Sequence, residues 1–282
     1  MYFQEIIAKL KAFWQEQGCT VLEGYDCNVG AGTLSPHTAL YALKHREWSV
    51  CYSQFCRRQT DGRYAKNPNR LSGYFQFQVL MKPFPENPQA LYLESLAMLG
   101  IKQNENDISF LEDNWENPSI GASGLGSEVW LNGMEITQWT YMQQIGGVKL
   151  DVIPLEITYG LERLAMYVQN VDSIFDIMWS KNMKYKDLFY DKEYEMSFYY
   201  NEEANIENLF EQFQKTEIEC EKLIAKKLIE PAYELALTCS NTLNLLDARS
   251  ALSQVERASY ILRVRNLVKK VCEMQVGKIQ KQ

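Results

Sequence analysis

The pair Asn132-Gly133 lies between two short runs of alternating side chains, and it limits the fold more than any other feature of this sequence. An Asn-Gly pair favours a tight turn that joins antiparallel strands. A two-residue turn pairs Leu131 with Met134, Trp130 with Glu135, Val129 with Ile136, and Glu128 with Thr137. Because successive side chains of a strand point to opposite faces, one face is apolar and the other carries Glu128, Trp130, Glu135 and Thr137. The sequence therefore predicts a β-hairpin within an antiparallel sheet.

Two carboxylates, Glu128 and Glu135, are thus expected to point the same way from a sheet whose opposite face is buried. Such an arrangement suits Mg²⁺ or an ammonium group. Two glutamates on a solvated sheet face would give the same pattern. The residues alone leave both interpretations open.

A second polar strand face is predicted at residues 74–81. Alternation groups Tyr74, Gln76 and Gln78 on one face, opposite a face of Phe75, Phe77 and Val79. Arg57 and Arg58 end the preceding strand, and Arg70 lies on the loop that returns to Tyr74. Guanidinium groups match phosphate geometry, so these residues are candidates for a nucleotide site. An ordinary hairpin with a solvated face remains the alternative.

A third segment, residues 156–163, runs from a strand through Gly160 into a helix. Arg163 lies in the first turn of that helix, where the helix N-terminus attracts anions. Arg163 is therefore positioned for a phosphate, although a surface arginine would show the same pattern.

The chain changes character near residue 180. Before that point we expect helices over residues 3–17, 88–99 and 161–169, and strands over residues 48–56, 74–81, 108–111 and 152–157. Beyond it glycine almost disappears, and segments such as 203–229 and 247–276 predict helices, with Pro231 separating two of them. We therefore predict an α+β fold. A catalytic domain at residues 1–180, built on an antiparallel sheet flanked by helices, precedes an all-α domain at residues 181–282.

Charge and cysteine content limit the partners and the compartment. The net charge is -7, with 11 acids and 5 bases in residues 191–230 and 7 bases and 2 acids in residues 250–282. Proteins that bind nucleic acid alone usually show a basic face, so such contacts should be local or assisted here. Seven irregularly spaced cysteines favour reduced thiols in a cytoplasmic protein. No apolar run reaches the roughly 20 residues that span a bilayer, so we expect no membrane contact.

Taken together and in this order, the segments resemble the signature motifs of class II aminoacyl-tRNA synthetases. The specific likeness is to the bacterial glycyl-tRNA synthetase alpha subunit family, over nearly the whole chain. The strings that carry it are Val29-Gly-Ala-Gly-Thr33 with Pro36, Asp61-Gly-Arg-Tyr64, Asn67-Pro-Asn-Arg70, Phe75-Gln-Phe-Gln-Val79, Glu112-Asp-Asn-Trp-Glu116, Gly133-Met-Glu-Ile-Thr-Gln138 and Ile157-Thr-Tyr-Gly-Leu-Glu-Arg163.

The resemblance implies roles at ATP. Arg58 resembles the arginine that holds the α-phosphate, while Arg57 is an alternative that would lie on the other face. Arg70 and Arg163 resemble the ligands of the outer phosphates, and Tyr74 resembles the ring that stacks on adenine. By likeness to the alanyl-tRNA synthetase core, the nucleotide and its Mg²⁺ are faced by Glu128 and Glu135. Gly160 completes the implied ATP set.

The resemblance also implies an amino-acid end. Glu156 is similar in position to the acid that binds the substrate amine. The other implied residues are Gln76, Gln78, Trp115, Gln138 and Thr158, with bulky walls such as Trp115 and Trp130 excluding side chains larger than that of glycine. Strict alternation puts Gln138 opposite Glu135, so it reaches the site only if the strand bulges.

The implied reaction is attack of glycine carboxylate on the α-phosphorus of ATP, followed by transfer of the glycyl group to tRNA(Gly). A carboxylate needs no general base at neutral pH, so catalysis would rest on positioning and charge. Its central residues would be Arg58, Arg163 and Glu135. The family pattern adds an alpha homodimer, with Pro36 at its interface, and a separate beta subunit in an alpha2beta2 assembly. The C-terminal helices either dock that subunit or merely pack on the core.

Two other functions are compatible with the same scaffold. One is the activation of a different amino acid, such as alanine. The other is a non-catalytic, synthetase-like partner or regulatory subunit, which the presence of Arg58, Arg70 and Arg163 disfavours.

Overall fold

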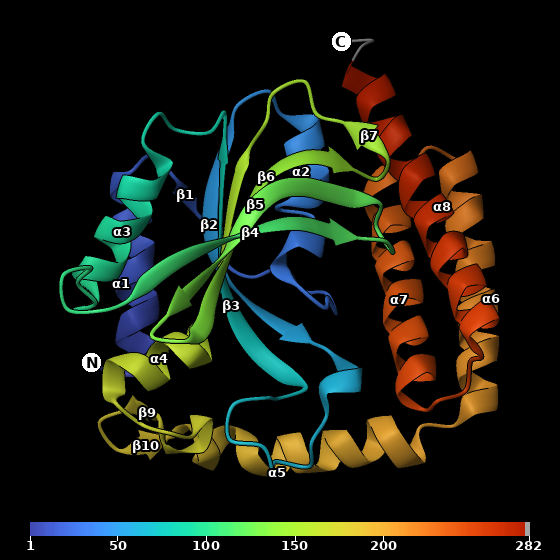
Figure 1. Cartoon of the computed structure of the whole chain (residues 1–282). Coiled ribbons are helices and arrows are strands. Elements are labelled where there is room, and N and C mark those ends of the chain that lie inside the picture. The colour runs from blue at the N-terminus through green and yellow to red at the C-terminus, as the bar shows by residue number, and fades with distance from the viewer. Residues whose placement is uncertain (280–282) are drawn as a thin grey trace.

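An eight-stranded sheet forms the centre of the computed structural model, which describes residues 1–279 (Figure 1). Its strand order is β1-β2-β3-β8-β6-β5-β4, with β7 paired to β6. Within residues 1–279 its pairings are antiparallel except for β1 with β2. The strands are β1 (Thr20–Val21), β2 (Trp48–Arg57), β3 (Gly73–Lys82), β4 (Ile108–Asn117), β5 (Ala122–Leu131), β6 (Met134–Ile145), β7 (Val148–Lys149) and β8 (Leu155–Gly160). A separate hairpin joins β9 (Met178–Ser180) to β10 (Met183–Lys184).

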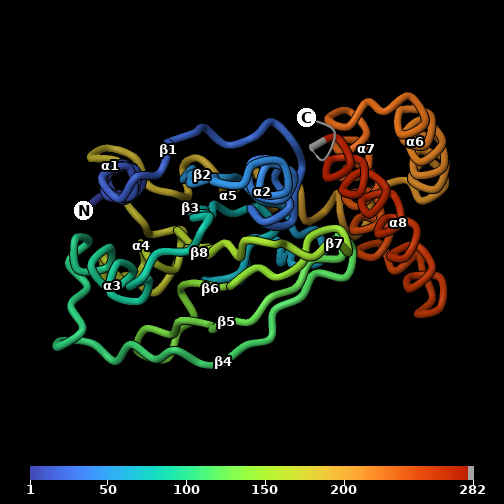
Figure 2. Tube along the Cα trace, turned by 90° about the horizontal axis from the view of Figure 1, so that it is seen from above, coloured from blue at the N-terminus to red at the C-terminus, as the bar shows by residue number. Residues whose placement is uncertain are grey.

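Helices cover both faces of this sheet, as Figure 2 shows. They are α1 (Phe3–Glu16), α2 (Ala39–Lys44), α3 (Pro88–Met98), α4 (Leu161–Gln169), α5 (Tyr185–Phe198), α6 (Ile206–Ala225), α7 (Ile229–Ala248) and α8 (Gln254–Ile279). One hydrophobic core packs α1, α3 and α4 against the sheet, and a second packs α2, α7 and α8 against its other face. The predicted α+β class, with an antiparallel sheet, flanking helices and a helical C-terminal region, is confirmed.

Local sequence explains most element boundaries. Helix α1 buries Phe3, Ile6, Leu10 and Trp14, which recur at the spacing of one helical face. Pro88 occupies the first turn of α3, where its missing N–H costs nothing. Pro231, which was predicted to separate two helices, lies inside the first turn of α7, and the break between α6 and α7 falls just before it, at residues 226–228.

Two strand predictions were wrong in extent. Strand β4 continues from the predicted 108–111 to Asn117, because it is an edge strand whose polar second half faces a pocket and solvent and so lacks an apolar pattern. Strand β8 begins at Leu155 rather than at Val152, since Pro154 has no N–H to donate to a sheet ladder.

The hairpin at Asn132-Gly133 forms as predicted at its turn, where both residues have positive φ, 47° and 87°. The pairs Leu131–Met134 and Trp130–Glu135 are confirmed. Beyond them a register shift pairs Val129 with Thr137 and Glu128 with Gln138. The predicted pairs Val129–Ile136 and Glu128–Thr137 were wrong, because a β-bulge inserts an extra residue that turn geometry does not reveal.

The bulge changes which side chains share a face. Thr137 was expected beside Glu128, but its hydroxyl accepts a hydrogen bond from the buried Tyr92 hydroxyl at 2.9 Å and is itself only 2% exposed. Gln138 takes the place opposite Glu128 and so lies on the carboxylate face.

The C-terminal helices α6, α7 and α8 form the bundle on the right of Figure 1. The acidic and basic blocks partly face each other there: Arg263 pairs with Glu217 at 2.5 Å and Lys270 with Glu221 at 2.6 Å. Lys281, one base of that block, lies outside the described residues. The β9–β10 hairpin crosses the predicted domain boundary at residue 180, which stays a prediction.

All seven cysteines, which fall within the described part of the chain, are unpaired. Of the helices in that part, none is both long enough and apolar enough to cross a lipid bilayer.

Candidate active site

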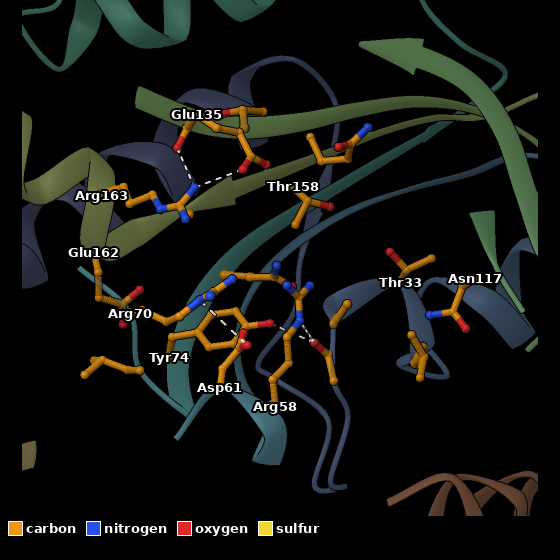
Figure 3. A pocket seen from close by; sticks show the side chains of 18 of the residues that line it. Thr33, Arg58, Asp61, Arg70, Tyr74, Asn117, Glu135, Thr158, Glu162 and Arg163 are labelled. Carbon is orange, nitrogen blue, oxygen red and sulfur yellow. Dashed lines mark hydrogen bonds and ion pairs between the residues drawn. The ribbon is translucent and has the colours of Figure 1, made fainter. Parts of the chain in front are cut away.

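A pocket of about 630 Å³ lies on the sheet face that carries Tyr74 and Gln76. Its walls come from η1 (Gly32–Leu34) and the loop before it, the loop between β2 and β3, strands β3, β4, β5, β6 and β8, the start of α4, and α7. Figure 3 shows Glu135 and Arg163 at one end, Arg70, Tyr74, Asp61 and Arg58 along one side, and Thr33 with Asn117 at the other end. Segments that are distant in sequence thus contribute charged groups to one cavity.

Arg58 and Tyr74 form one unit of the wall. The guanidinium carbon of Arg58 lies 5.4 Å from the centre of the Tyr74 ring. Arg58 Nε donates to the backbone carbonyl of Gly30 at 3.1 Å, and the Tyr74 hydroxyl donates to the same oxygen at 2.8 Å. The loop before η1 therefore fixes both side chains along one side of the pocket.

Arg57 is not brought to this pocket. Its guanidinium lies over the Phe55 ring, 5.8 Å from the ring centre, and it lines a second, much smaller cavity beside Lys192 and Glu193. Neighbouring residues of a strand point to opposite faces, and here that rule separates Arg57 from Arg58.

Two further arginines line the pocket, each beside a carboxylate. Arg70 Nε lies 3.7 Å from Asp61 Oδ1, with its side chain 53% exposed. Arg163 Nη1 donates to the backbone carbonyl and to Oε2 of Glu135, at 2.9 Å each. Arg163 stands in the first turn of α4, whose N-cap is Gly160, as predicted.

Both hairpin carboxylates line the same pocket. Glu128 Oε2 accepts from the indole N–H of Trp130 at 2.9 Å, while Trp130 itself is not among the lining residues. Because of the bulge, Gln138 also lines the pocket, and its amide donates to Asp113 Oδ2 at 3.0 Å. Gln138 was expected to reach the site only if its strand contained a bulge, and the register shift supplies that bulge.

Glu156 lies beneath the opposite end of the pocket. It is 2% exposed and accepts from the Thr33 hydroxyl at 2.5 Å and from the Gln78 amide. Gln78 in turn accepts from the Thr158 hydroxyl at 2.9 Å. Burial raises the pKa of Glu156 to about 7, although these hydrogen bonds oppose the shift.

The amino-acid candidates therefore form two layers. Trp115, Gln138, Thr158 and Gln76 line the pocket, whereas Glu156 and Gln78 lie behind the lining. Gln76 is fixed by the backbone N–H of Gly32, which donates to its side-chain oxygen at 2.8 Å.

Sequence reasoning missed several lining residues. Thr33, Asp61, Asp113 and Asn117 lie in or beside the strings that carry the family likeness, which was the signal available for them. Ser240 and Asn244 come from α7, where polar residues interrupt an apolar helix. Glu162 also lines the pocket, and it accepts from the Phe75 backbone N–H at 2.7 Å and from the Tyr185 hydroxyl at 2.8 Å. Burial raises the pKa of Glu162 to about 7.

The two hairpin carboxylates are the metal candidates. In residues 1–279 no cluster of three or more His, Cys, Asp or Glu forms a ready cation site. Mg²⁺, however, is usually held by one or two carboxylates together with substrate phosphates and water. Glu128 and Glu135, which share a pocket with three arginines, fit a metal that arrives with a nucleotide.

Comparison with known proteins adds two findings. The family model of the glycyl-tRNA synthetase alpha subunit matches residues 3–280. Among solved structures, the chain is similar to that of Desulfitobacterium hafniense PylSc, a pyrrolysyl tRNA synthetase, at 13% identity and a TM-score of 0.45, covering 64% of this chain and 72% of that one. It is also similar to the crystal structure of pyrrolysyl-tRNA synthetase from Desulfitobacterium hafniense, at 13% identity and a TM-score of 0.43, covering 64% and 75%. Structural similarity at this level is too low to support an inference about this chain, so its family assignment rests on the family model alone.

Proposed function

The chain belongs to the glycyl-tRNA synthetase alpha subunit family, and we propose that its pocket holds ATP along the arginine side and glycine at the Thr33 end. Membership makes the chain the catalytic subunit of a class II aminoacyl-tRNA ligase that uses ATP. The observation that carries the proposed site is the convergence of Arg58, Arg70 and Arg163 on one cavity. The assignment of residues to substrate groups is our proposal.

For ATP, we assign the α-phosphate to Arg58 and the outer phosphates to Arg70 and Arg163. Guanidinium groups donate to phosphate oxygens in pairs, and these three line different stretches of the wall. The Tyr74 ring, which is held by Gly30, lies beside Arg58 and would stack on adenine. Arg57 has no part in this assignment because it faces the other cavity.

For glycine, we assign the ammonium group to the Thr33 and Thr158 hydroxyls and the Gln76 amide. Glu156 supplies negative charge directly behind them through Thr33 and Gln78. Trp115 and Gln138 form the adjoining wall. A missing methyl group gives only about 1–3 kcal/mol of discrimination through binding, so the wall must exclude larger side chains by contact.

Glu128 and Glu135 would hold Mg²⁺. When bound, the ion would neutralise phosphate charge, which is its usual contribution in phosphate chemistry. The protein's own part is to keep both carboxylates on one face, and the Trp130 indole orients Glu128 for that purpose.

The chemical step needs positioning and charge rather than proton transfer. Glycine carboxylate attacks the α-phosphorus, the bond to the β-phosphate oxygen breaks, and pyrophosphate leaves. The fixed guanidinium of Arg58 stabilises the charge that builds on the α-phosphate oxygens. In the second step a ribose hydroxyl at the 3′ end of the tRNA attacks the glycyl carbonyl carbon of the adenylate. An ester forms as the hydroxyl loses its proton, the acyl–phosphate bond breaks, and AMP leaves.

The family also implies a beta subunit partner together with tRNA. We propose that the chain forms a homodimer and joins that subunit in an alpha2beta2 assembly in the cytoplasm. The ion pairs between α6 and α8 use part of the charge of these helices internally, which leaves the remaining exposed charges for docking.

Glycine-dependent ATP–pyrophosphate exchange tests the proposal. The chain, with and without its beta subunit, should catalyse exchange with glycine and not with alanine. Absence of exchange in both preparations, or equal exchange with alanine, would contradict the assignment of the site.

A further inference from the structure

The C-terminal helices hold the loop between β2 and β3 at its start, middle and end. This loop, residues 58–72, carries Arg58, Asp61 and Arg70 of the pocket wall. Figure 1 shows the loop reaching down to α5, which runs beneath the sheet toward the helical bundle. The contacts therefore join a region remote in sequence to the nucleotide side of the pocket.

The strongest contact is at the end of the loop, where Glu193 of α5 is buried at 4% exposure. Its two carboxylate oxygens accept from the Ser72 backbone N–H at 2.9 and 3.0 Å. Oε2 also accepts from the Ser72 hydroxyl at 2.8 Å and from the Gly73 backbone N–H at 3.3 Å. Two of these donors are backbone groups that cannot reverse their role, so the site requires an acceptor-only side chain such as a carboxylate.

The middle of the loop is held by Ser197, one turn along the same helix. Its hydroxyl oxygen accepts from the Tyr64 backbone N–H at 3.0 Å and donates to Glu193 Oε1 at 3.3 Å. The Tyr64 hydroxyl donates to Glu202 at 2.9 Å. Tyr64 has a positive φ of 55°, a conformation that costs free energy unless surrounding contacts support it.

The start of the loop is held by α7. Asn241 Oδ1 accepts from the Gln59 side-chain amide at 2.6 Å. Gln59 follows Arg58 directly and is 1% exposed. The hydrogen bond between Gln59 and Asn241 therefore fixes the backbone next to Arg58.

We propose that Glu193 is a positioning residue for ATP: it fixes Ser72 and Gly73 and thereby sets the positions of Arg70 and Tyr74. The inference rests on the proposed assignment of Arg70 and Tyr74 to the nucleotide. Arg70 precedes Ser72 by two residues and Tyr74 follows Gly73 directly. Displacement of Ser72 and Gly73 therefore moves both ligands at once. Of the three groups proposed for glycine, Thr33 and Thr158 lie on other segments, and Gln76 of β3 is held separately by the Gly32 backbone N–H.

The test compares Glu193→Gln with Glu195→Gln in the full chain together with its beta subunit. Glutamine at 193 would turn an N–H₂ group toward backbone donors, whereas Glu195 is exposed on the same helix. We expect Glu193→Gln to raise the KM for ATP by about tenfold, the consequence of losing one charge-assisted hydrogen bond. The KM for glycine should change less than about twofold, because Thr33 and Thr158 lie outside β3 and Gln76 keeps its hydrogen bond from Gly32. Glu195→Gln should match the wild type in both constants.

Two measurements separate positioning from misfolding and from an error in the proposed function. Limited trypsin digestion should cut Glu193→Gln faster at Arg63, Lys66 and Arg70, at a temperature where thermal unfolding shows both variants folded. ATP binding measured by equilibrium dialysis should weaken in parallel. An unchanged KM and Kd for ATP in a folded Glu193→Gln protein would overturn the inference, as would equal rises in the KM of both substrates. Absence of glycine-dependent exchange in the wild type would contradict the proposed function. Digestion and dialysis would still test whether Glu193 fixes Ser72 and Gly73.

Discussion

Arg163 and Glu135 are bound to each other at one end of the pocket, with Nη1 of the arginine 2.9 Å from both the backbone carbonyl oxygen and Oε2 of the glutamate. The side chains are 38% and 35% exposed, so the pair contributes less than about 1 kcal/mol to folding. In the proposed site Arg163 would bind a phosphate and Glu135 would bind Mg²⁺, so each side chain would exchange its present partner for a substrate group when ATP and Mg²⁺ bind.

Glu135→Gln tests this arrangement. Loss of the carboxylate should raise the Mg²⁺ concentration needed for half-maximal exchange by at least about fivefold, because one of two metal ligands is weakened. The free energy of unfolding should change by less than about 1 kcal/mol. Glu112→Gln, an exposed change on β4, is the control. An unaltered Mg²⁺ requirement in Glu135→Gln would remove this residue from the metal site.

Arg57→Ala at the last residue of β2 and Arg58→Ala at the next residue form a matched pair, because the two side chains line different cavities. We expect Arg58→Ala to lower kcat for exchange by about 10²–10³, the usual cost of removing one preorganised donor from a transition state. Arg57→Ala should lower kcat less than about fivefold, since most changes outside a site have small effects. The reverse order of effects would assign the α-phosphate to Arg57.

The dependence of glycine binding on pH should report Glu156. Its pKa is raised to about 7 by burial, so it gains its charge as the pH rises through about 7. Glycine carries its ammonium group throughout this range, and the KM for glycine should therefore fall between about pH 6 and pH 8. In Glu156→Gln the KM should be high and independent of pH over that interval. A KM that rises with pH in the wild type would contradict the proposed role.

The raised pKa of Glu156 affects folding stability in the opposite direction: stability decreases as pH rises, whereas glycine binding should improve. Between the unfolded value and about 7 the folded chain binds more protons at Glu156 than the unfolded chain does. The contribution of this group to stability is therefore greatest at low pH and declines as pH rises toward about 7.

Trp115 and Trp130 were both suggested as walls that exclude larger amino acids, but the structure places them differently. Trp115 lines the pocket, whereas Trp130 does not and instead binds Glu128. Trp115→Ala should lower the ratio of kcat/KM for glycine over alanine by about tenfold or more, within the range that steric exclusion supplies. Trp130→Ala should leave that ratio unchanged. Exchange assays with both amino acids decide between them.

Gly126 tests the packing of the strand that carries Glu128. A Cβ at this position would lie 1.9 Å from the Trp139 backbone oxygen, a contact that no rotamer relieves. Gly126→Ala should lower the free energy of unfolding by about 2–3 kcal/mol. Gly277→Ala, in α8 with nothing within 4 Å of the new carbon, should raise it by up to about 1 kcal/mol. Denaturant unfolding of both variants measures the contrast, and equal stabilities would refute it.

Local pattern sufficed for much of this molecule. The positive φ angles at Asn132 and Gly133, the Pro88 start of α3 and the polar face of β3 all depend on neighbouring residues, so the amino-acid order alone determined them. The family strings likewise marked Arg58, Arg70 and Arg163, since each lies in a short contiguous motif.

Only the tertiary structure decided relationships between segments that are far apart in sequence. The bulge in β6 paired the Thr137 hydroxyl with the buried Tyr92 and put Gln138 opposite Glu128, because register depends on packing against both neighbouring strands. Burial beneath Thr33 and Gln78 gave Glu156 its raised pKa. The separation of Arg58 from Arg57, and the hold of Glu193 on Ser72, likewise depend on which elements cover each face of the sheet. Such contacts join residues separated by long stretches of chain, and no local periodicity encodes them.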